Sequence, residues 1–199
     1  MTQAIPASRM QMIRAAEKVA FPEFKTAHWS TSSLHRLIEH IIGRHHAYLR
    51  SELPWMERAI ARASEIGGRA DARTLVPLTR TFRFFRRELE LHLRKEEEVL
   101  FPLVRQIETA VNSGANLPRF SFGSIANPIG IMEQDHEGEK RQIERMLDLT
   151  GNYSGPPQTA HIYGPLFDRL QALDSDMRLH VHLEDEMLFP RVRLLEGES

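Results

Sequence analysis

The chain has 199 residues, which is enough for one domain with a sizeable hydrophobic core. Hydrophobic residues make up 41% and charged residues 27%, and the formal net charge of −1 predicts no field that would favour nucleic acid or an anionic membrane. No apolar run approaches the roughly 20 residues that span a bilayer, and the N-terminus lacks a signal-peptide pattern, so we predict a cytoplasmic protein.

The absence of cysteine excludes disulfides, iron–sulfur clusters and thiol catalysis. A bound metal ion would therefore need nitrogen and oxygen ligands. The ten histidines are roughly twice the number expected by chance, so such ligands are abundant.

Helical periodicity recurs through most of the chain, whereas alternating strand patterns are scarce. We expect an N-terminal arm over 1–27, with one short helix at about 8–19. Residues 28–199 then form an all-α, antiparallel four-helix bundle, because four long helical patterns are joined by short connections.

The first long helix is expected to start near Ser32 or Ser33, either of which is a suitable N-cap. Pro54 should kink or split this helix, since proline removes a backbone donor and clashes with the preceding turn. The pair Gly67-Gly68 should end it.

The second helix is expected over about 74–111, followed by a loop over 112–122 that is rich in Gly, Asn, Ser and Pro. Asn127-Pro128 should open the third helix as a cap followed by proline at the first helical position. The fourth helix is expected over about 159–195.

The strongest feature is an internal repeat. The segments His92–Arg105 and His180–Arg193 share eight identical positions at a constant offset of 88, including His-x-x-x-Glu and a following Leu-Phe-Pro. Residues at i and i+4 lie on one helix face about 6 Å apart along the axis, so both side chains can reach one ion. Two such helices facing each other would supply two imidazoles and two bridging carboxylates.

The spacing alone is weak support, because the chain holds four His-x-x-x-Glu pairs and about one would arise at random. Helix phase separates the overlapping pairs in the fourth helix. His180 shares an apolar stripe with Met177 and Leu173, whereas His182 lies on nearly the opposite side. We therefore interpret His182 and Glu186 as a surface pair.

The remaining two helices should complete the site. The third helix offers His136, which by itself is more simply explained as a buried, hydrogen-bonded histidine. Opposite two His/Glu pairs it becomes a candidate ligand. In the first helix His45 and His46 both lie on the apolar arc, and periodicity does not separate them. Mixed histidine and carboxylate ligands suit iron or manganese, and also zinc.

With these motifs the sequence resembles the hemerythrin-like (HHE cation-binding) domains, and among them the repair-of-iron-centres proteins. The resemblance covers roughly Trp29 to Arg193. It is carried by four ordered motifs, 37–46 with Leu53-Pro54, His92–Pro102, Pro128–Glu137 and His180–Arg191.

The resemblance implies two iron ions held by His46, His92, His136 and His180, with Glu96 and Glu184 as bridging carboxylates. It favours His46 over His45, because the family's first histidine lies eight residues before the proline. Glu88 and Asp135 match acidic positions beside the metal site of similar proteins.

Two departures from the family pattern stand out. The N-terminal domain with a cysteine pair, usual in repair-type relatives, is replaced by a short arm without cysteine. A further histidine that some relatives have in the stretch matching 60–73 is missing. His45, Glu88, Glu133 or a water molecule could take its place.

The function that this resemblance implies is repair of iron centres damaged by nitric oxide or oxidative stress, through iron release to a damaged iron-centre protein. The role is that of a metal-binding iron donor more than of an enzyme. Alternatives are a module that binds or senses O₂ or NO, and a di-iron oxidase or peroxidase. Four histidines to two glutamates argue against the oxidase, whose sites are richer in glutamate. We expect no nucleic-acid or membrane partner, and a homodimer as the candidate oligomer.

Overall fold

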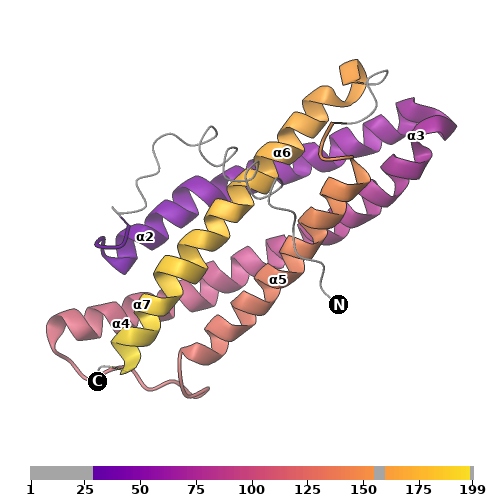
Figure 1. Cartoon of the computed structure of the whole chain (residues 1–199). Helices are drawn as coiled ribbons and strands as arrows, with labels where there is room; N and C mark the ends of the chain where they lie inside the picture. Colours follow the sequence, from indigo (N-terminus) through magenta and orange to yellow (C-terminus); the bar gives the residue numbers. More distant parts are fainter. Residues whose placement is uncertain (1–28, 155–159, 198–199) are drawn as a thin grey trace, which may run out of the picture. The chain divides into compact units, whose positions relative to one another are not determined.

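The computed structural model describes residues 29–154 and 160–197, with the side chains of 68–70 and 160–162 left out of the description. The expected helix at 8–19 lies outside the described residues. The chain divides after Ser32 into two units. The second unit is an all-α four-helix bundle, as predicted (Figure 1).

The regular elements follow one another with few interruptions, and three short π-helical segments lie within the long helices. In chain order they are α2 (Leu34–His40), η2 (Ile41–His46), α3 (Ala47–Lys95), η3 (Glu96–Leu100), α4 (Phe101–Ser113), α5 (Ala126–Leu149), α6 (Ala160–His182), η5 (Leu183–Leu188) and α7 (Phe189–Gly197).

The 49-residue α3 folds back on itself and supplies parts of two bundle helices (Figure 1). Ser64 Oγ lies 3.2 Å from Thr79 Oγ1, and Arg83 donates to Glu57 at 3.0 Å, although 15 and 26 residues separate these partners along the chain. The reversal falls near Gly67, where the first helix was expected to end. Helical turns nevertheless continue through it, and Pro54 neither splits nor ends the helix.

The expected cap of the third helix was wrong. The N-cap residue of α5 is Ile125, and Asn127 instead donates from its side chain to the carbonyl of Phe122 at 2.8 Å. The cap expected for the first helix is confirmed, because Ser33 Oγ accepts a hydrogen bond from the backbone of Arg36.

Two helix N-termini are stabilised by carboxylates from neighbouring helices. Glu108 in α4 accepts hydrogen bonds from the backbone N–H groups of Leu34 and His35, at 2.6 and 2.9 Å. Glu196 in α7 accepts one from the backbone of Ile125 at 2.8 Å. Glu108 and Glu196 are also 88 residues apart, so the repeat extends beyond the segments that revealed it. A carboxylate at a helix N-terminus pairs with otherwise unsatisfied N–H groups and complements the helix dipole.

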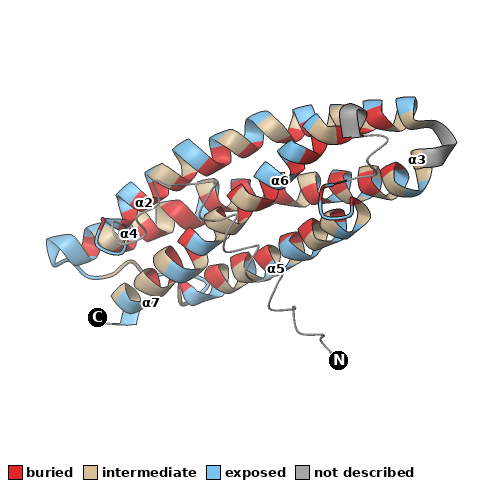
Figure 2. Ribbon diagram, turned by 45° about the horizontal axis from the view of Figure 1, so that its top comes forward, coloured by how far each residue is buried: buried red, intermediate tan, exposed pale blue. Residues whose placement is uncertain are grey.

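Buried residues lie on the inward faces of the helices (Figure 2). One apolar cluster extends from Leu49, Leu93 and Met177 toward the chain reversal in α3. Past the π segments, Phe101 and Phe189 are again fully buried. A band of buried histidine and glutamate lies between these two apolar regions, at the positions singled out by the repeat.

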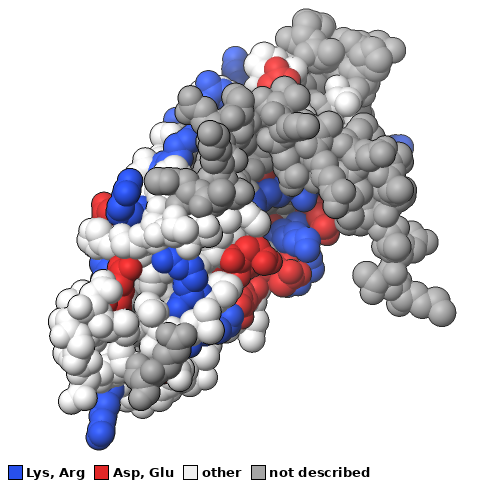
Figure 3. Space-filling view, turned by 60° about the vertical axis from the view of Figure 1, so that its left-hand side comes forward, with Lys and Arg blue, Asp and Glu red and all other residues white. Residues whose placement is uncertain are grey.

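None of the described helices combines the length and apolar character that crossing a membrane requires. On the face seen in Figure 3, acidic and basic side chains lie next to one another, in keeping with the near-neutral net charge. Ion pairs also join different helices, as between Arg169 and Glu52 at 2.5 Å and between Arg193 and Glu133 at 2.9 Å.

Replacing Glu108 by alanine should destabilise the bundle by about 1–2 kcal/mol, because two backbone N–H groups at the start of α2 lose their acceptor. The free energy of unfolding from a urea titration measures the effect. Glu137→Ala, at an exposed position in α5, serves as the control and should change it by less than about 0.5 kcal/mol. Equal effects of both substitutions would contradict the assigned role of Glu108.

Candidate metal centre

The structure brings together all six residues that the sequence put forward as ligands. Each is at most 3% exposed. They come from all four bundle helices: His46 ends η2, His92 lies in α3, Glu96 begins η3, His136 lies in α5, His180 in α6 and Glu184 in η5.

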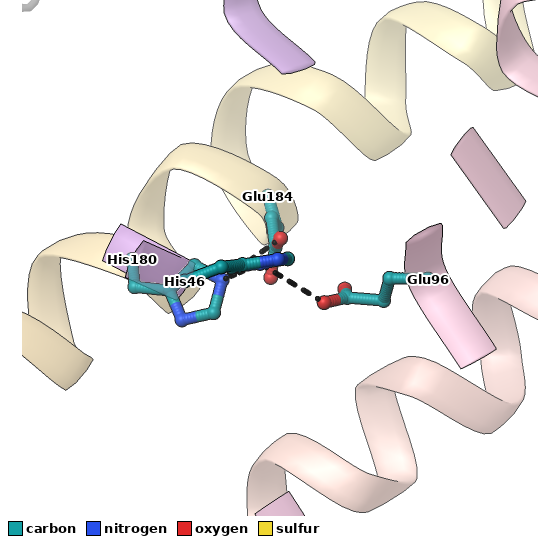
Figure 4. Close-up of side chains that lie close together, drawn as sticks. All are labelled: His46, Glu96, His180 and Glu184. Carbon is teal, nitrogen blue, oxygen red and sulfur yellow. Dashed lines mark hydrogen bonds and ion pairs between the residues drawn. The ribbon is translucent and has the colours of Figure 1, made fainter. Parts of the chain in front are cut away.

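The first of two overlapping groups consists of His46, His180, Glu96 and Glu184, whose side chains converge in Figure 4. The Nε2 atoms of His46 and His180 lie 3.1 Å apart. His46 Nε2 is 3.4 Å from Glu96 Oε2, and His180 Nε2 is 3.0 Å from Glu184 Oε1. Four potential ligand atoms therefore surround one point.

The second group consists of His92, His136 and the same two glutamates. His92 Nε2 and His136 Nε2 lie 3.2 Å apart. His92 Nε2 is 3.3 Å from Glu96 Oε1, and His136 Nε2 is 3.2 Å from Glu184 Oε2. Each carboxylate thus turns one oxygen toward each group, which is the arrangement expected of two carboxylates that bridge two metal ions.

The three π segments fall at these residues, as is common at functional sites. In η3 the backbone N–H of Phe101 donates to the carbonyl of Glu96, five residues earlier, and Phe189 does the same to Glu184 in η5. The prolines at 102 and 190 come immediately afterwards. Because proline has no N–H to continue the i−4 pattern, the Leu-Phe-Pro signature marks the place where each helix can widen.

Two further carboxylates pair with candidate ligand histidines from outside the cluster. His46 donates from Nδ1 to Glu97 at 2.6 Å, and His136 donates from Nδ1 to Asp185 at 2.8 Å. These acids directly follow the two central glutamates. Neither acid was among the candidates that the sequence put forward. The two acids are 88 residues apart, which is the offset of the repeat, and this spacing could have identified them from the sequence.

Asp135 lies beside the centre, as predicted. Its Oδ2 is 3.5 Å from His92 Nδ1 and accepts a hydrogen bond from Lys95 at 2.6 Å. The neighbouring imidazole of His92 and the hydrogen bond from Lys95 lower the pKa of Asp135 to about 2, although burial acts in the other direction.

The other three proposed supplementary residues do not belong to either group of candidate ligands. His45 is buried, donates from Nδ1 to Asp176 at 3.1 Å, and stacks on the His180 ring, so it packs against a candidate ligand. Glu88 pairs with its neighbour Arg87, and Glu133 pairs with Arg193. Neither glutamate belongs to the two ligand groups in the described part of the chain.

The prediction that His182 and Glu186 form a surface pair is confirmed. His182 and Glu186 are both exposed, whereas His180 and Glu184 are fully buried. Helix phase and the repeat register therefore distinguished the buried pair from the exposed one, although the two overlap in the sequence.

Sequence reasoning also missed Glu139 in α5. It is 4% exposed, and its Oε1 lies 3.9 Å from His92 Nδ1. Burial raises the pKa of its carboxyl group to about 7. Its position three residues after His136, on the same helix face, could have identified Glu139 from the sequence.

The electrostatics of the cluster favour cations at its centre. Burial opposes a charged imidazole at His136, but the hydrogen bond to Asp185 and the nearby carboxylate of Glu184 raise its pKa to about 10. The pKa of His92 is also well above its usual value, because Glu96 and Asp135 outweigh burial. The histidines in turn hold the pKa of Glu184 well below its usual value, although burial acts in the other direction.

The buried carboxylate oxygens that lack a hydrogen bond also fit a metal-binding site. Both oxygens of Glu96 and Oε2 of Glu184 are buried without a hydrogen-bond donor among the described residues. Burying carboxylates is costly unless they are paired or coordinate a metal. A cation shared by these oxygens and the four Nε2 atoms would satisfy them together.

A helical bundle with a buried centre of four histidines and two shared carboxylates defines a metal-binding bundle. The chain belongs to the hemerythrin HHE cation-binding domain family, whose model matches residues 37–192. It is 31% identical over 173 residues to the iron-sulfur cluster repair protein YtfE of Escherichia coli O157:H7, and 30% identical to that of Escherichia fergusonii. Each alignment covers 85% of this chain and 70% of the relative.

Glu97→Gln should weaken metal binding about 10- to 100-fold, because His46 loses the charged acceptor that fixes its ring. Competition with a chelator of known affinity measures the change. The neighbouring Glu98→Gln removes the same charge from an exposed side chain and should leave the affinity unchanged. Equal losses in both variants would mean that only net charge matters.

Metal binding at pH 7 should release protons, because a metal ion and a proton compete for the same Nε2 atoms of His92 and His136, whose pKa values are raised. Affinity should consequently rise with pH up to about 10. Zn²⁺ added to weakly buffered protein with a pH indicator measures the release. Metal uptake without proton release would contradict the assigned ligands.

Proposed function

We propose that the protein is a non-haem di-iron protein that helps to repair damaged iron centres by releasing iron to them. The observation that carries this proposal is the division of Glu96 and Glu184 between two histidine pairs. One oxygen of each glutamate faces each pair. Two ions side by side account for this arrangement better than one.

Iron is the metal that the ligand set favours. Each position would have two imidazole nitrogens and two carboxylate oxygens, a mixed set that suits iron and manganese and that zinc also accepts. The family and the repair proteins among the relatives support iron over the other two. When bound, the two ions would supply redox chemistry that the side chains lack.

Release of iron is consistent with what surrounds the ligands. Glu97, Asp135 and Asp185 each contact the Nδ1 side of a ligand histidine, and their side chains are 22%, 31% and 30% exposed. These carboxylates therefore extend from the buried centre toward solvent. Negative side chains that reach solvent would attract a departing cation and give it successive oxygen contacts.

The acceptor would be a protein whose iron centre has been damaged by nitric oxide or oxidants. The similar proteins are named for iron-sulfur cluster repair, which supports this target for the chain. Without cysteine the chain cannot hold a thiolate-ligated cluster itself, so its part would be to provide iron rather than a preassembled cluster.

Ferrous protein carrying two irons per chain should transfer iron to an apo iron–sulfur protein supplied with sulfide, and the acceptor's cluster absorbance should rise in proportion. The double variant His92→Leu, His180→Leu should bind neither iron and transfer none, because each position loses one of its two imidazoles. Glu186→Gln, at an exposed position, is the control and should behave as the wild type.

An iron-loaded protein that gives no iron to the acceptor would contradict the repair proposal. Reversible spectral change with O₂ or NO, without transfer, would favour a gas-binding or sensing module instead. Sustained turnover with peroxide would favour an oxidase or peroxidase.

A further inference from the structure

The two halves of the centre are related by an approximate two-fold symmetry. His46 and His136 occupy equivalent places. Each donates from Nδ1 to the acid that follows a central glutamate. Each also stacks on a phenylalanine of the repeat, His46 on Phe101 at 5.8 Å and His136 on Phe189 at 6.0 Å.

The same symmetry relates the two ligands of the repeat. His180 packs beside His46, and His92 packs beside His136, with ring centroids 4.9 and 4.8 Å apart. A shift of 90 residues relates His46 to His136. The residues that contact His180 on the side away from the other candidate ligands can therefore be compared, position by position, with those that contact His92 there.

The comparison shows where the symmetry is broken. The residue before His46 is His45, whereas the residue before His136 is Asp135. Three residues after these ligands stand a fully buried Leu49 and the buried Glu139. The ring of His180 is thus backed by His45, stacked at 5.6 Å, while Nδ1 of His92 faces two carboxylates.

Glu139 differs from Asp135 and Glu97 in its partners. Asp135 pairs with Lys95 at 2.6 Å, and Glu97 pairs with Arg50 at 2.7 Å, so part of each charge is neutralised. Among the described residues, no lysine or arginine lies within ion-pair distance of Glu139. Both of its oxygens are buried there without a hydrogen bond, and so is Nδ1 of His92.

A donor and an acceptor that are both buried and unsatisfied, 3.9 Å apart, need only a small side-chain movement to pair. A carboxylate that accepts the Nδ1 proton of a ligand histidine fixes its ring and makes Nε2 a stronger donor to a metal. His180 has no such acid, because Nδ1 of its buried ring lacks a hydrogen bond in the described structure.

We propose that Glu139 makes the two metal positions unequal, so that iron is held more tightly between His92 and His136 than between His46 and His180. The inference rests on the proposed di-iron centre and identifies which of its ions leaves first. Glu139 acts through His92 and is therefore a positioning residue. Its added negative charge favours the cation at the nearer position.

The test follows iron removal from ferrous wild-type protein by excess ferrous-iron chelator. Release should occur in two phases of one iron each. In Glu139→Gln the slow phase should become about 10-fold faster or more, and the fast phase should not change. Glu139→Leu, which copies the residue at the symmetric position, should behave in the same way.

Glu137→Gln removes a charge from an exposed position of the same helix and should leave both phases as in the wild type. Mössbauer spectra of the ⁵⁷Fe-loaded protein add a readout that a merely structural role would not change selectively. Glu139→Gln should alter one of the two iron signals and leave the other in place. Circular dichroism establishes that each variant is folded.

Release of both irons in a single phase from the wild type would overturn the inference, and so would equal acceleration of both phases in Glu139→Gln and Glu139→Leu. A different result would contradict the repair proposal. If the phases differ as expected but no iron reaches an apo acceptor, the inequality stands and the repair function falls. If iron is transferred from two positions that behave alike, the repair function stands.

Discussion

The structure depends on one constraint, which is that two carboxylates and four imidazoles lie buried between two apolar regions of the bundle. Such a band is costly unless its charges are satisfied. Part of the compensation comes from the histidines themselves, and part from acids such as Glu97 and Asp185 that fix them from outside. The oxygens of Glu96 remain without a hydrogen bond among the described residues, and a shared metal cation would satisfy them.

The buried cluster of candidate ligands could be predicted from the sequence because it obeys local geometry. A spacing of four places histidine and glutamate on one helix face, and a second copy in the same register distinguishes His180 from the nearby His182. The choice between His45 and His46 was harder. Both lie in the π segment η2, where the widened turn shifts the helical phase, so a period of 3.6 residues could not separate them.

What the sequence could not supply comes from contacts between helices. Glu97 and Asp185 resemble surface acids until a neighbouring helix brings a histidine to them. The start of α5 was misjudged for the same reason, since Glu196, 71 residues away, provides the acceptor that Asn127 was expected to provide. Glu139 has no counterpart in the repeat, and its importance emerges only when the two halves of the centre are compared.

The central claim is that two irons lie side by side, each between a pair of histidines, and share both glutamates. The most direct measurement is a crystal structure of iron-loaded protein with anomalous diffraction recorded on both sides of the iron edge. The account predicts two iron peaks, one between His46 and His180 and one between His92 and His136, with Glu96 and Glu184 contacting both. A single peak, or iron bound elsewhere, would contradict it.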